Sequence, residues 1–235
     1  MNNSSIYYTT KVVNMSSEDS SRSGGTRAYR SSLREEQARD TRRRILQSAS
    51  EVFARKGYSG TSLSDIATGA GVSVESVKLH GPKRQLLLAA FEVAFAGAEG
   101  QSSLSEGPDM QRVMAIEPVE DFLAAVVGYI ADANARTSGL WAAFVAAAAS
   151  DDVVKSVFDA LLARRKRDYR SLVALVQERG LLVAELAQTE LHRRADVLSF
   201  LMSPEGHAQL VTQAGWSFTR YRDWLIDAVH GALTA

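Results

Sequence analysis

Apolar residues recur at three- and four-residue spacings along most of the chain from residue 41 onward, which is the period of an amphipathic α-helix. Gly, Pro, Ser and Asp interrupt this pattern and mark where helices start and stop. The pattern predicts an all-α fold, with a head of three short helices and a larger helical body. The expected helices cover about residues 41–56, 62–70, 74–79, 83–100, 119–136, 138–150, 152–179, 190–202, 204–215 and 218 onward.

The stretch TSLSDIATGAGVSVESVKLH (residues 61–80) has the pattern of two short helices joined by a tight turn. Ser62 is expected to cap the first helix, and Gly71 supplies the positive φ that a tight turn needs. Ser73 caps a second helix, whose inward residue is Val77. Such a pair is a helix-turn-helix, whose second helix fits the major groove of DNA. The same spacing also fits an ordinary buried helical hairpin, so the hairpin alone leaves both interpretations open.

The segments on either side of the hairpin extend the pattern. An upstream helix carries an apolar face and ends at Gly57, and a downstream helix begins near residue 83. The whole block, from residue 41 to about residue 95, resembles the DNA-binding domain of the TetR family of bacterial repressors. The residues that carry the resemblance are Thr41, Arg42, Ile45, Leu46, Ala49, Phe53, Gly57, Tyr58, Thr61, Ser62, Ile66, Ala67, Ala70, Gly71, Val72, Ser73, His80, Leu87 and Leu88.

This resemblance implies that the head binds double-stranded DNA through its third helix and the neighbouring helix ends. In the family, the start of the second helix contacts phosphate, the third helix reads the operator, and the start of the fourth lies beside the DNA backbone. Small hydroxyls and helix N-termini suit phosphates, and longer side chains reach base edges. The candidate DNA-binding residues are Thr61, Ser62, Ser73, Val74, Glu75, Ser76, Lys78, Leu79, His80, Lys83 and Arg84.

The chain departs from the family pattern within this block. Lys78 stands where the family usually carries Tyr, Gly81 where it carries Phe, and Lys83 where Ser or Thr is common. Glu75 directs a carboxylate at an anionic duplex, which is unfavourable unless it accepts from a cytosine amino group. The operator sequence therefore cannot be carried over from a relative. An alternative function stays open, in which the chain is a helical protein-interaction module that has lost DNA binding.

Residues 1–38 are rich in Ser, Arg, Gly and Asn without sustained periodicity, which predicts a disordered basic extension. Its arginines form either an arm that reaches into the minor groove or a solvated tail with nonspecific attraction for phosphate. Met15 is an alternative start of translation. The predicted domains are this extension at residues 1–38, a DNA-binding head at 39–84, and an effector-binding and dimerisation body at 85–235.

Six aromatic residues sit on four successive helices of the body, which in the family surround an effector cavity. Aromatic residues at this spacing are also ordinary core. The alanine-rich segment 138–150 is expected to be buried on all sides and to leave space for a small apolar or aromatic effector, hydrogen-bonded by Tyr129. The candidate ligand-binding residues are Phe91, Phe122, Tyr129, Trp141, Phe144 and Phe158.

The C-terminal stretch RADVLSFLMSPEGHAQLVTQAGWSFTRYRDWL resembles the C-terminal half of many actinobacterial-type TetR regulators, in which paired helices of two subunits form a four-helix interface. The resemblance implies a homodimer, and two heads related by a two-fold axis would read a palindromic operator. The candidate interface residues are Leu198, Leu201, Trp224, Leu225 and Ala228. The predicted function is a ligand-responsive, homodimeric transcriptional repressor.

The composition argues against several other classes of protein. Hydrophobic residues make up 46% of the 235 residues, enough for a core, and the chain has no cysteine for disulfides or thiolate metal sites. The four histidines show no metal-ligand spacing, so no metal, no cofactor and no enzymatic activity are expected. No apolar run suits a signal peptide or a membrane span, so a cytoplasmic location is expected.

A formal net charge of zero hides an asymmetry along the chain. Residues 1–90 hold 14 lysines and arginines against 8 carboxylates, whereas residues 91–235 hold 13 against 19. A basic head on an acidic body is the layout expected when one end meets phosphates. One basic stretch of the body, RRKRDYR at residues 164–170, is interpreted as a solvated helix face that could also attract nucleic acid.

Overall fold

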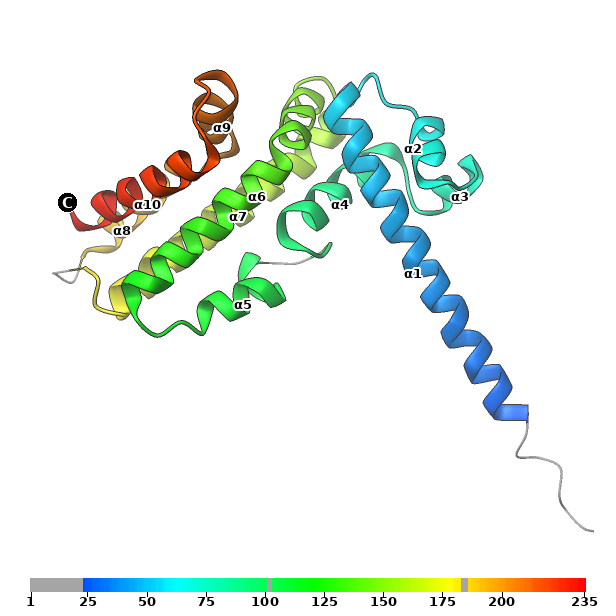
Figure 1. Ribbon diagram of the computed structural model, residues 1–235, viewed down its shortest axis with the longest axis horizontal. Coiled ribbons are helices and arrows are strands. Elements are labelled where there is room, and N and C mark those ends of the chain that lie inside the picture. Colours follow the sequence, from blue (N-terminus) through cyan, green and yellow to red (C-terminus); the bar gives the residue numbers. More distant parts are fainter. Residues whose placement is uncertain (1–22, 101–102, 183–185) are drawn as a thin grey trace, which may run out of the picture. The chain divides into compact units, whose positions relative to one another are not determined.

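The computed structural model describes residues 23–100, 103–182 and 186–235, and within these ranges it contains helices and connections but no strand (Figure 1). The prediction of an all-α fold is therefore confirmed. The chain divides into two compact units, Met1–Asp40 and Thr41–Ala235. The elements are α1 (Ser23–Lys56), α2 (Leu63–Ala70), α3 (Val74–Leu79), α4 (Lys83–Ala96), η1 (Leu104–Glu106), α5 (Pro108–Met114), α6 (Val119–Ala148), α7 (Asp152–Glu178), α8 (Gln188–Leu201), α9 (Pro204–His207), the π-helical η2 (Ala208–Gln213) and α10 (Phe218–Thr234).

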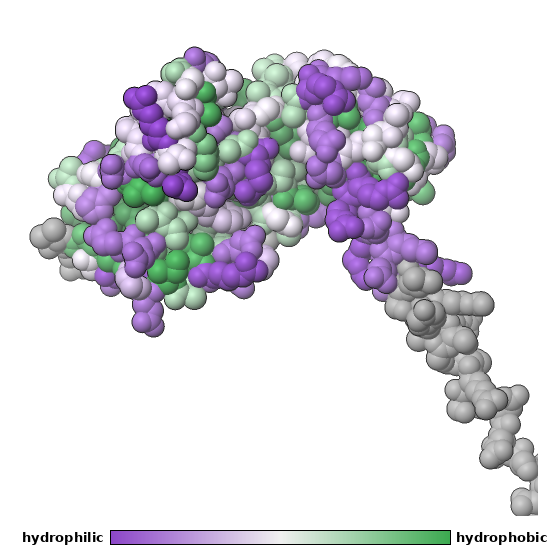
Figure 2. All heavy atoms as spheres, viewed as in Figure 1, coloured by the Kyte–Doolittle hydropathy of each residue, from purple (hydrophilic) through white to green (hydrophobic). Residues whose placement is uncertain are grey.

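The N-terminal extension differs from the prediction, because α1 already begins at Ser23. Residues 34–38 are strong helix formers, and a nucleated helix gains one hydrogen bond with each residue that it adds. The residues at 27, 30, 34 and 39 therefore belong to a helix, which corrects the prediction of disorder for this part of the extension, while residues 1–22 lie outside the described part of the chain. Figure 2 shows the surface of α1 at residues 34–44 as strongly hydrophilic.

One apolar cluster holds the head together, and α1, α2, α3 and α4 all contribute to it. The fully buried members include Ile45, Phe53, Ile66, Val77 and Leu87. Burying a side chain of this size contributes roughly 1.5–3 kcal/mol. Helices α1 and α2 approach closely because Gly69 has no side chain: a Cβ at this position would lie 2.4 Å from Ser48 Oγ. The Ser48 hydroxyl instead donates to the Ile66 carbonyl at 2.9 Å, so this buried polar group is satisfied.

Helix α6 is continuous, although the sequence pattern predicts a break near Thr137. Thr137 is fully buried, and its hydroxyl donates to the Ala133 carbonyl at 2.7 Å, which satisfies it within the helix. Gly139 permits close packing, because a Cβ there would lie 3.2 Å from the Cβ of Ala54 in α1. The expectation that residues 138–150 are buried on all sides is also wrong, since Val145 is 40% exposed.

Head and body share one element, α4. Leu86 and Leu87 of this helix are fully buried in the head cluster, and the same cluster continues into Trp141 and Phe144 of α6. A second cluster fills the rest of the body between α5, α6, α7, α8 and α10. The predicted boundary between residues 84 and 85 thus falls inside a helix that completes the core of the head and also packs against α6.

A small polar group of side chains lies inside the body where α9 packs against α6. His207 is 4% exposed and packs edge-on against Tyr221, with ring centroids 5.1 Å apart. Neither of its ring nitrogens has a hydrogen-bond partner among the residues that the structure describes. Burial lowers the pKa of His207 and raises the pKa of Tyr221 to about 12. The fold therefore accommodates the neutral imidazole.

We predict that this histidine makes the fold acid-sensitive. Because the folded pKa lies below the ordinary value of about 6.5, the unfolded chain binds more protons, and stability is lost as the pH falls through that value. The variant His207→Phe keeps the edge-on packing without the titrating group. From pH 8 to pH 5, the free energy of unfolding of this variant, measured by denaturant titration, should fall less than that of the wild type. An equal fall in both proteins would contradict this assignment.

Candidate functional site

The turn between α2 and α3 is closed by capping residues at each helix end. The Ser62 hydroxyl accepts from the Asp65 N–H, and the Asp65 carboxylate accepts from the Ser62 N–H, which makes a complete capping box. Gly71 adopts φ 63°, the left-handed conformation that favours glycine at a helix C-terminus. Ser73 caps α3 by accepting from the Ser76 N–H at 3.1 Å. A serine cap contributes roughly 1 kcal/mol to its helix.

Two arginines of α1 hold this turn and the end of α3. Arg44 donates to the carbonyls of Gly71 and of the residue before it, at the C-terminus of α2. Arg42 donates to the carbonyl of His80, the C-cap of α3, at 2.6 Å, and pairs with Glu99 at 2.6 Å. Carbonyls at a helix C-terminus lack partners within the helix and attract cations. Since a six-residue helix is unstable in isolation, these contacts fix the position of α3.

Helix α3 buries Val77 fully and packs the half-buried Val74 against the head cluster. Its exposed side chains are Glu75, Lys78 and Leu79. The exposed candidates are Ser73, Glu75, Lys78 and Leu79, and the half-buried ones are Val74, Ser76 and His80. Leu79 is apolar but 88% exposed, so its side chain contributes nothing to the core. Apolar side chains on a recognition helix contact thymine methyl groups, and exposed cations such as Lys78 and Arg84 suit phosphates.

Two of the candidate DNA contacts are engaged inside the head, which corrects their assignment. Thr61 is 3% exposed, and its hydroxyl donates to the Gly57 carbonyl at 2.7 Å at the end of α1. The Lys83 ammonium donates to the carbonyls of Tyr58 and Thr61 at 3.0 Å each and lies 4.3 Å from the centroid of the Tyr58 ring. Both residues therefore hold the connection between α1 and α2. Ser62 stays exposed, with its hydroxyl in the capping box.

Gly81 accounts for one departure from the family pattern. Its φ of 121° is rarely adopted by residues with a side chain, and a Cβ would lie 2.7 Å from Gln85 Oε1. A residue with a side chain would therefore be strained in this turn by its backbone conformation, even if the flexible Gln85 side chain moved aside. Burial and the nearby Arg42 lower the pKa of the preceding His80. The neutral imidazole adds no positive charge at the end of α3.

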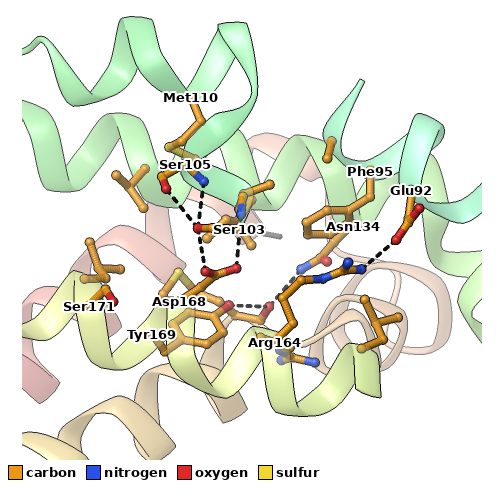
Figure 3. Close-up of a pocket in the computed structure, with 18 of the residues that line it drawn as sticks. Glu92, Phe95, Ser103, Ser105, Met110, Asn134, Arg164, Asp168, Tyr169 and Ser171 are labelled. Atoms are coloured by element: carbon orange, nitrogen blue, oxygen red, sulfur yellow. Dashed lines mark hydrogen bonds and ion pairs between the residues drawn. The ribbon is translucent and has the colours of Figure 1, made fainter. Parts of the chain in front are cut away.

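The body contains a cavity of about 290 Å³ between α4, α6, α7 and the segment that follows α4 (Figure 3). Its walls are mostly apolar and come from helices far apart in the sequence. They include Phe91, Phe95, Met110, Ile130, Trp141 and Leu172. This volume is near the lower end of the range for small-molecule sites, roughly 300–1,000 Å³.

Charged side chains line two sides of the cavity. Glu92 of α4 is 9% exposed, pairs with Arg164 of α7 at 2.7 Å, and accepts from the Gly100 N–H at 2.8 Å. Asp168 accepts from the Ser103 hydroxyl at 2.7 Å and from the next backbone N–H. Figure 3 shows the Glu92–Arg164 pair on one side and Asp168 with Ser103 on the other. Both carboxylates anchor the described parts of the segment between α4 and α5.

A third group of polar side chains gathers around the Met202 carbonyl. The Asn134 Nδ2 donates to this carbonyl at 3.1 Å, and the Tyr169 hydroxyl reaches it at 3.5 Å. Arg165 donates to the neighbouring Ser199 carbonyl. Burial raises the pKa of Tyr169, although the guanidinium of Arg165 opposes the shift. This part of the wall therefore offers an amide, a phenol and a guanidinium, all of which are hydrogen-bond donors.

Among the six aromatic candidates, only Phe91 and Trp141 line the cavity. Phe144 and Phe158 pack behind them in an aromatic cluster, with the Phe158 centroid 5.1 Å from that of Trp141 and 5.2 Å from that of Phe144. Helical spacing places all four inside the protein. It does not separate a cavity wall from the core behind it.

Phe122 and Tyr129 also lie away from the cavity wall, which corrects their assignment. Phe122 is fully buried, with the Arg179 guanidinium 4.1 Å from the centroid of its ring. The Tyr129 hydroxyl donates to the Phe95 carbonyl at 3.4 Å. Tyr129 is not among the residues that line the cavity, so it does not reach a ligand bound there.

The candidate interface residues divide between core and surface. Leu198 and Leu225 are fully buried in the core of their own chain, so they do not contact a partner. The other three are Leu201 and Ala228, which are half-buried, and Trp224, which is 38% exposed. Phe200 was not predicted, yet it is 77% exposed. It lies off the apolar stripe of α8, which is the reason the pattern did not single it out.

The charged residues of the cavity wall were likewise not predicted. Glu92 stands alone in the apolar run LLLAAFEVAFA, which is one signal that the sequence carries. The spacing of Arg164, Arg165, Asp168 and Tyr169 is a second signal, since residues one, four and five apart share a helix face. The stretch 164–170 is therefore not simply a solvated face, because four of its residues line the cavity.

The described residues contain no group of three His, Asp or Glu side chains that could hold a metal ion. None of the described helices combines the length and the hydrophobicity that crossing a bilayer requires.

Comparisons with known proteins identify the head. Residues 45–90 match the family model described as bacterial regulatory proteins, tetR family. No curated protein that was compared matches the chain. Several solved structures share the fold of this chain. Their sequence identities to it are low, so the similarity concerns the fold alone. One, from Rhodococcus sp., is assigned to the TetR-family transcriptional regulators; it is 19% identical over 83% of this chain and 99% of that chain, with a TM-score of 0.63.

Two further structures contain small molecules. The transcriptional regulator FadR from Bacillus subtilis, in complex with stearoyl-CoA, is 14% identical over 80% of this chain and 97% of that chain, with a TM-score of 0.60. A protein from Saccharomonospora viridis assigned as a transcriptional regulator, in complex with choline, is 21% identical over 79% and 93%, with a TM-score of 0.58. Residues 45–90 are therefore a domain of the tetR family of bacterial regulatory proteins, and the chain that carries this domain has the fold of solved transcriptional regulators.

Proposed function

We propose that this protein is a sequence-specific transcriptional repressor that binds DNA as a homodimer and responds to a small ligand. The observation that carries the proposal is the geometry of α3, which is fixed by caps and by two arginines of α1 while Glu75, Lys78 and Leu79 stay exposed. The purified full chain should shift DNA from upstream of its own coding region in the presence of excess nonspecific competitor. A shift that the competitor abolishes completely would refute sequence-specific binding.

A second candidate function is a protein-interaction module without DNA binding. The observation that favours it is Leu79, which is 88% exposed at the end of α3 and suits an apolar partner as well as a thymine methyl group. Glu75 adds a negative charge to the same helix. The competition experiment separates the two functions, because an interaction module does not discriminate between DNA sequences.

The homodimer is supported by apolar side chains left exposed on the C-terminal helices. Phe200 of α8 is 77% exposed and Trp224 of α10 is 38% exposed, although both helices pack in the body. Contiguous exposed apolar patches mark interaction surfaces, and permanent interfaces are more apolar than transient ones. We therefore assign the subunit interface to the outward faces of α8 and α10.

The ligand response is supported by the cavity and by its relation to α4. Phe91 and Phe95 of α4 line the cavity, while Leu87 of the same helix belongs to the core of the head. Two regulators with this fold hold ligands as different as choline and stearoyl-CoA. A ligand releases DNA only if it binds the non-operator conformation better, and a hundredfold preference corresponds to about 2.7 kcal/mol of coupling.

We predict that Lys78→Gln weakens binding to all DNA sequences, because Lys78 is an exposed cation at the end of α3 and suits a phosphate. The slope of log affinity against log salt concentration should fall by about one for each lost phosphate contact. Lys166→Gln removes the same charge from an exposed position of α7 and serves as the matched control. Fluorescence anisotropy over a salt series measures both. A sequence-selective loss with an unchanged slope would assign Lys78 to a base edge.

A separate prediction concerns the subunit interface. Phe200→Glu should convert the dimer to monomer in sedimentation experiments, because a buried unpaired carboxylate is strongly unfavourable at an apolar interface. Its affinity for a palindromic operator should fall with the dimer. Val153→Glu introduces the same charge at a residue of α7 that is 52% exposed and should leave the dimer intact. If Phe200→Glu sediments as an unaltered dimer, the interface lies elsewhere.

A further inference from the structure

The charged side chains of the cavity wall differ in whether they have a charged or hydrogen-bonding partner. Arg164 is paired with Glu92 at 2.7 Å, and Asp168 accepts two hydrogen bonds from the segment before α5. Arg165 also lines the cavity, but in the described part of the chain it has no carboxylate within ion-pair distance. Its neighbours are the Ser199 carbonyl and the rings of Trp141 and Tyr169, whose centroids lie 5.9 Å and 5.6 Å from the guanidinium carbon.

A second donor lies beside this guanidinium and is poorly satisfied. The Tyr169 hydroxyl is 3.5 Å from the Met202 carbonyl, whereas strong O–H···O hydrogen bonds span about 2.5–3.0 Å. Tyr169 is only 6% exposed, so water does not readily complete its hydrogen bonding. An unpaired guanidinium next to an under-used phenol is a donor set for an anionic oxygen, and bonds from such groups to a carboxylate are among the stronger ones.

The remaining wall suits a flexible apolar chain. The cavity of about 290 Å³ corresponds to roughly ten waters at about 30 Å³ each. Three methionines line it, Met110, Met114 and Met202, and methionine adapts its shape to irregular apolar ligands. Apart from the charged and polar groups described above, most of the lining side chains are aliphatic or aromatic.

We propose that the cavity binds an amphiphilic anion, an alkyl chain of about ten heavy atoms that ends in a carboxylate, with the carboxylate against Arg165. This rests on the proposed function, in which the cavity is the effector site. A cationic head group would meet the unpaired guanidinium, and the aromatic faces nearest to it are already occupied by that guanidinium. Asp168 already accepts two hydrogen bonds from the chain, so its carboxylate gains less from a cationic ligand.

Three probes with the same chain length and different head groups test the proposal on the full-length protein: decanoate, decanol and decyltrimethylammonium. Calorimetric titration should give the tightest binding for decanoate, about ten- to a hundredfold tighter than decanol, as expected for a hydrogen bond to a charged group. Arg165→Gln should reduce decanoate to the affinity of decanol and leave decanol unchanged. Arg167→Gln, exposed on the same helix and outside the cavity wall, is the control for net charge.

Arg165→Lys keeps the charge and should retain part of the preference, which distinguishes recognition from loss of folding. Equal affinities of the wild type for decanoate and decanol, or tighter binding of decyltrimethylammonium, would overturn the proposal. So would an undiminished preference for decanoate in Arg165→Gln, or binding of none of the three probes. DNA affinity is measured separately with decanoate present: selective binding without release of DNA would refute the ligand response and leave the assignment of the ligand class intact.

Discussion

The head depends on arginine side chains that hold the carbonyl groups at the ends of two short helices. Helix α3 has six residues and one buried side chain, so neither its length nor its packing keeps it folded. Arg44 binds the C-terminal carbonyls of α2, and Arg42 binds the C-cap of α3. A guanidinium suits this role because its donors project at fixed angles from a planar group. The outward face of α3 is therefore free of structural contacts and is available to a duplex.

Arg42 also connects the end of α3 to the segment that borders the cavity. Arg42 pairs with Glu99, and the next residue, Gly100, donates its N–H to Glu92 in the cavity wall. Two consecutive residues after α4 thus make these contacts: Glu99 pairs with the arginine that holds the end of α3, and Gly100 binds the cavity wall. A ligand that displaces Glu92 from Arg164, or shifts α4, acts on a segment that also positions the end of α3. Coupling of this kind requires that the contacts have two alternative arrangements that the ligand and DNA stabilise differently.

The helix-turn-helix was predictable because its signals are local. Ser62, Gly71 and Ser73 act on residues within one helical turn, and each has the backbone geometry that its residue type suggests. The arginine contacts were not predictable, since Arg42 and Glu99 are 57 residues apart and no local pattern links them. In the body, apolar spacing located the inward faces of the helices but did not distinguish a core from a cavity wall.

Two errors show the limits of periodicity in physical terms. The sequence pattern predicts a break near Thr137, whereas α6 is continuous through it, and Gly139 in the same helix admits a close neighbour. Leu198 is a candidate for the subunit interface because the C-terminal helices resemble a dimer interface of the family, yet its side chain is fully buried in the core of its own chain. Phe200, out of phase, remained exposed.

Amide hydrogen exchange of the full chain, with and without a duplex selected by the protein itself, is the most direct test of DNA recognition by α3. We expect DNA to protect the N-terminus of α2, the whole of α3 and the start of α4. Protection in α7 should not change. A complex in which these segments exchange as fast as in the free protein, while α8 and α10 become protected, would contradict DNA recognition by α3.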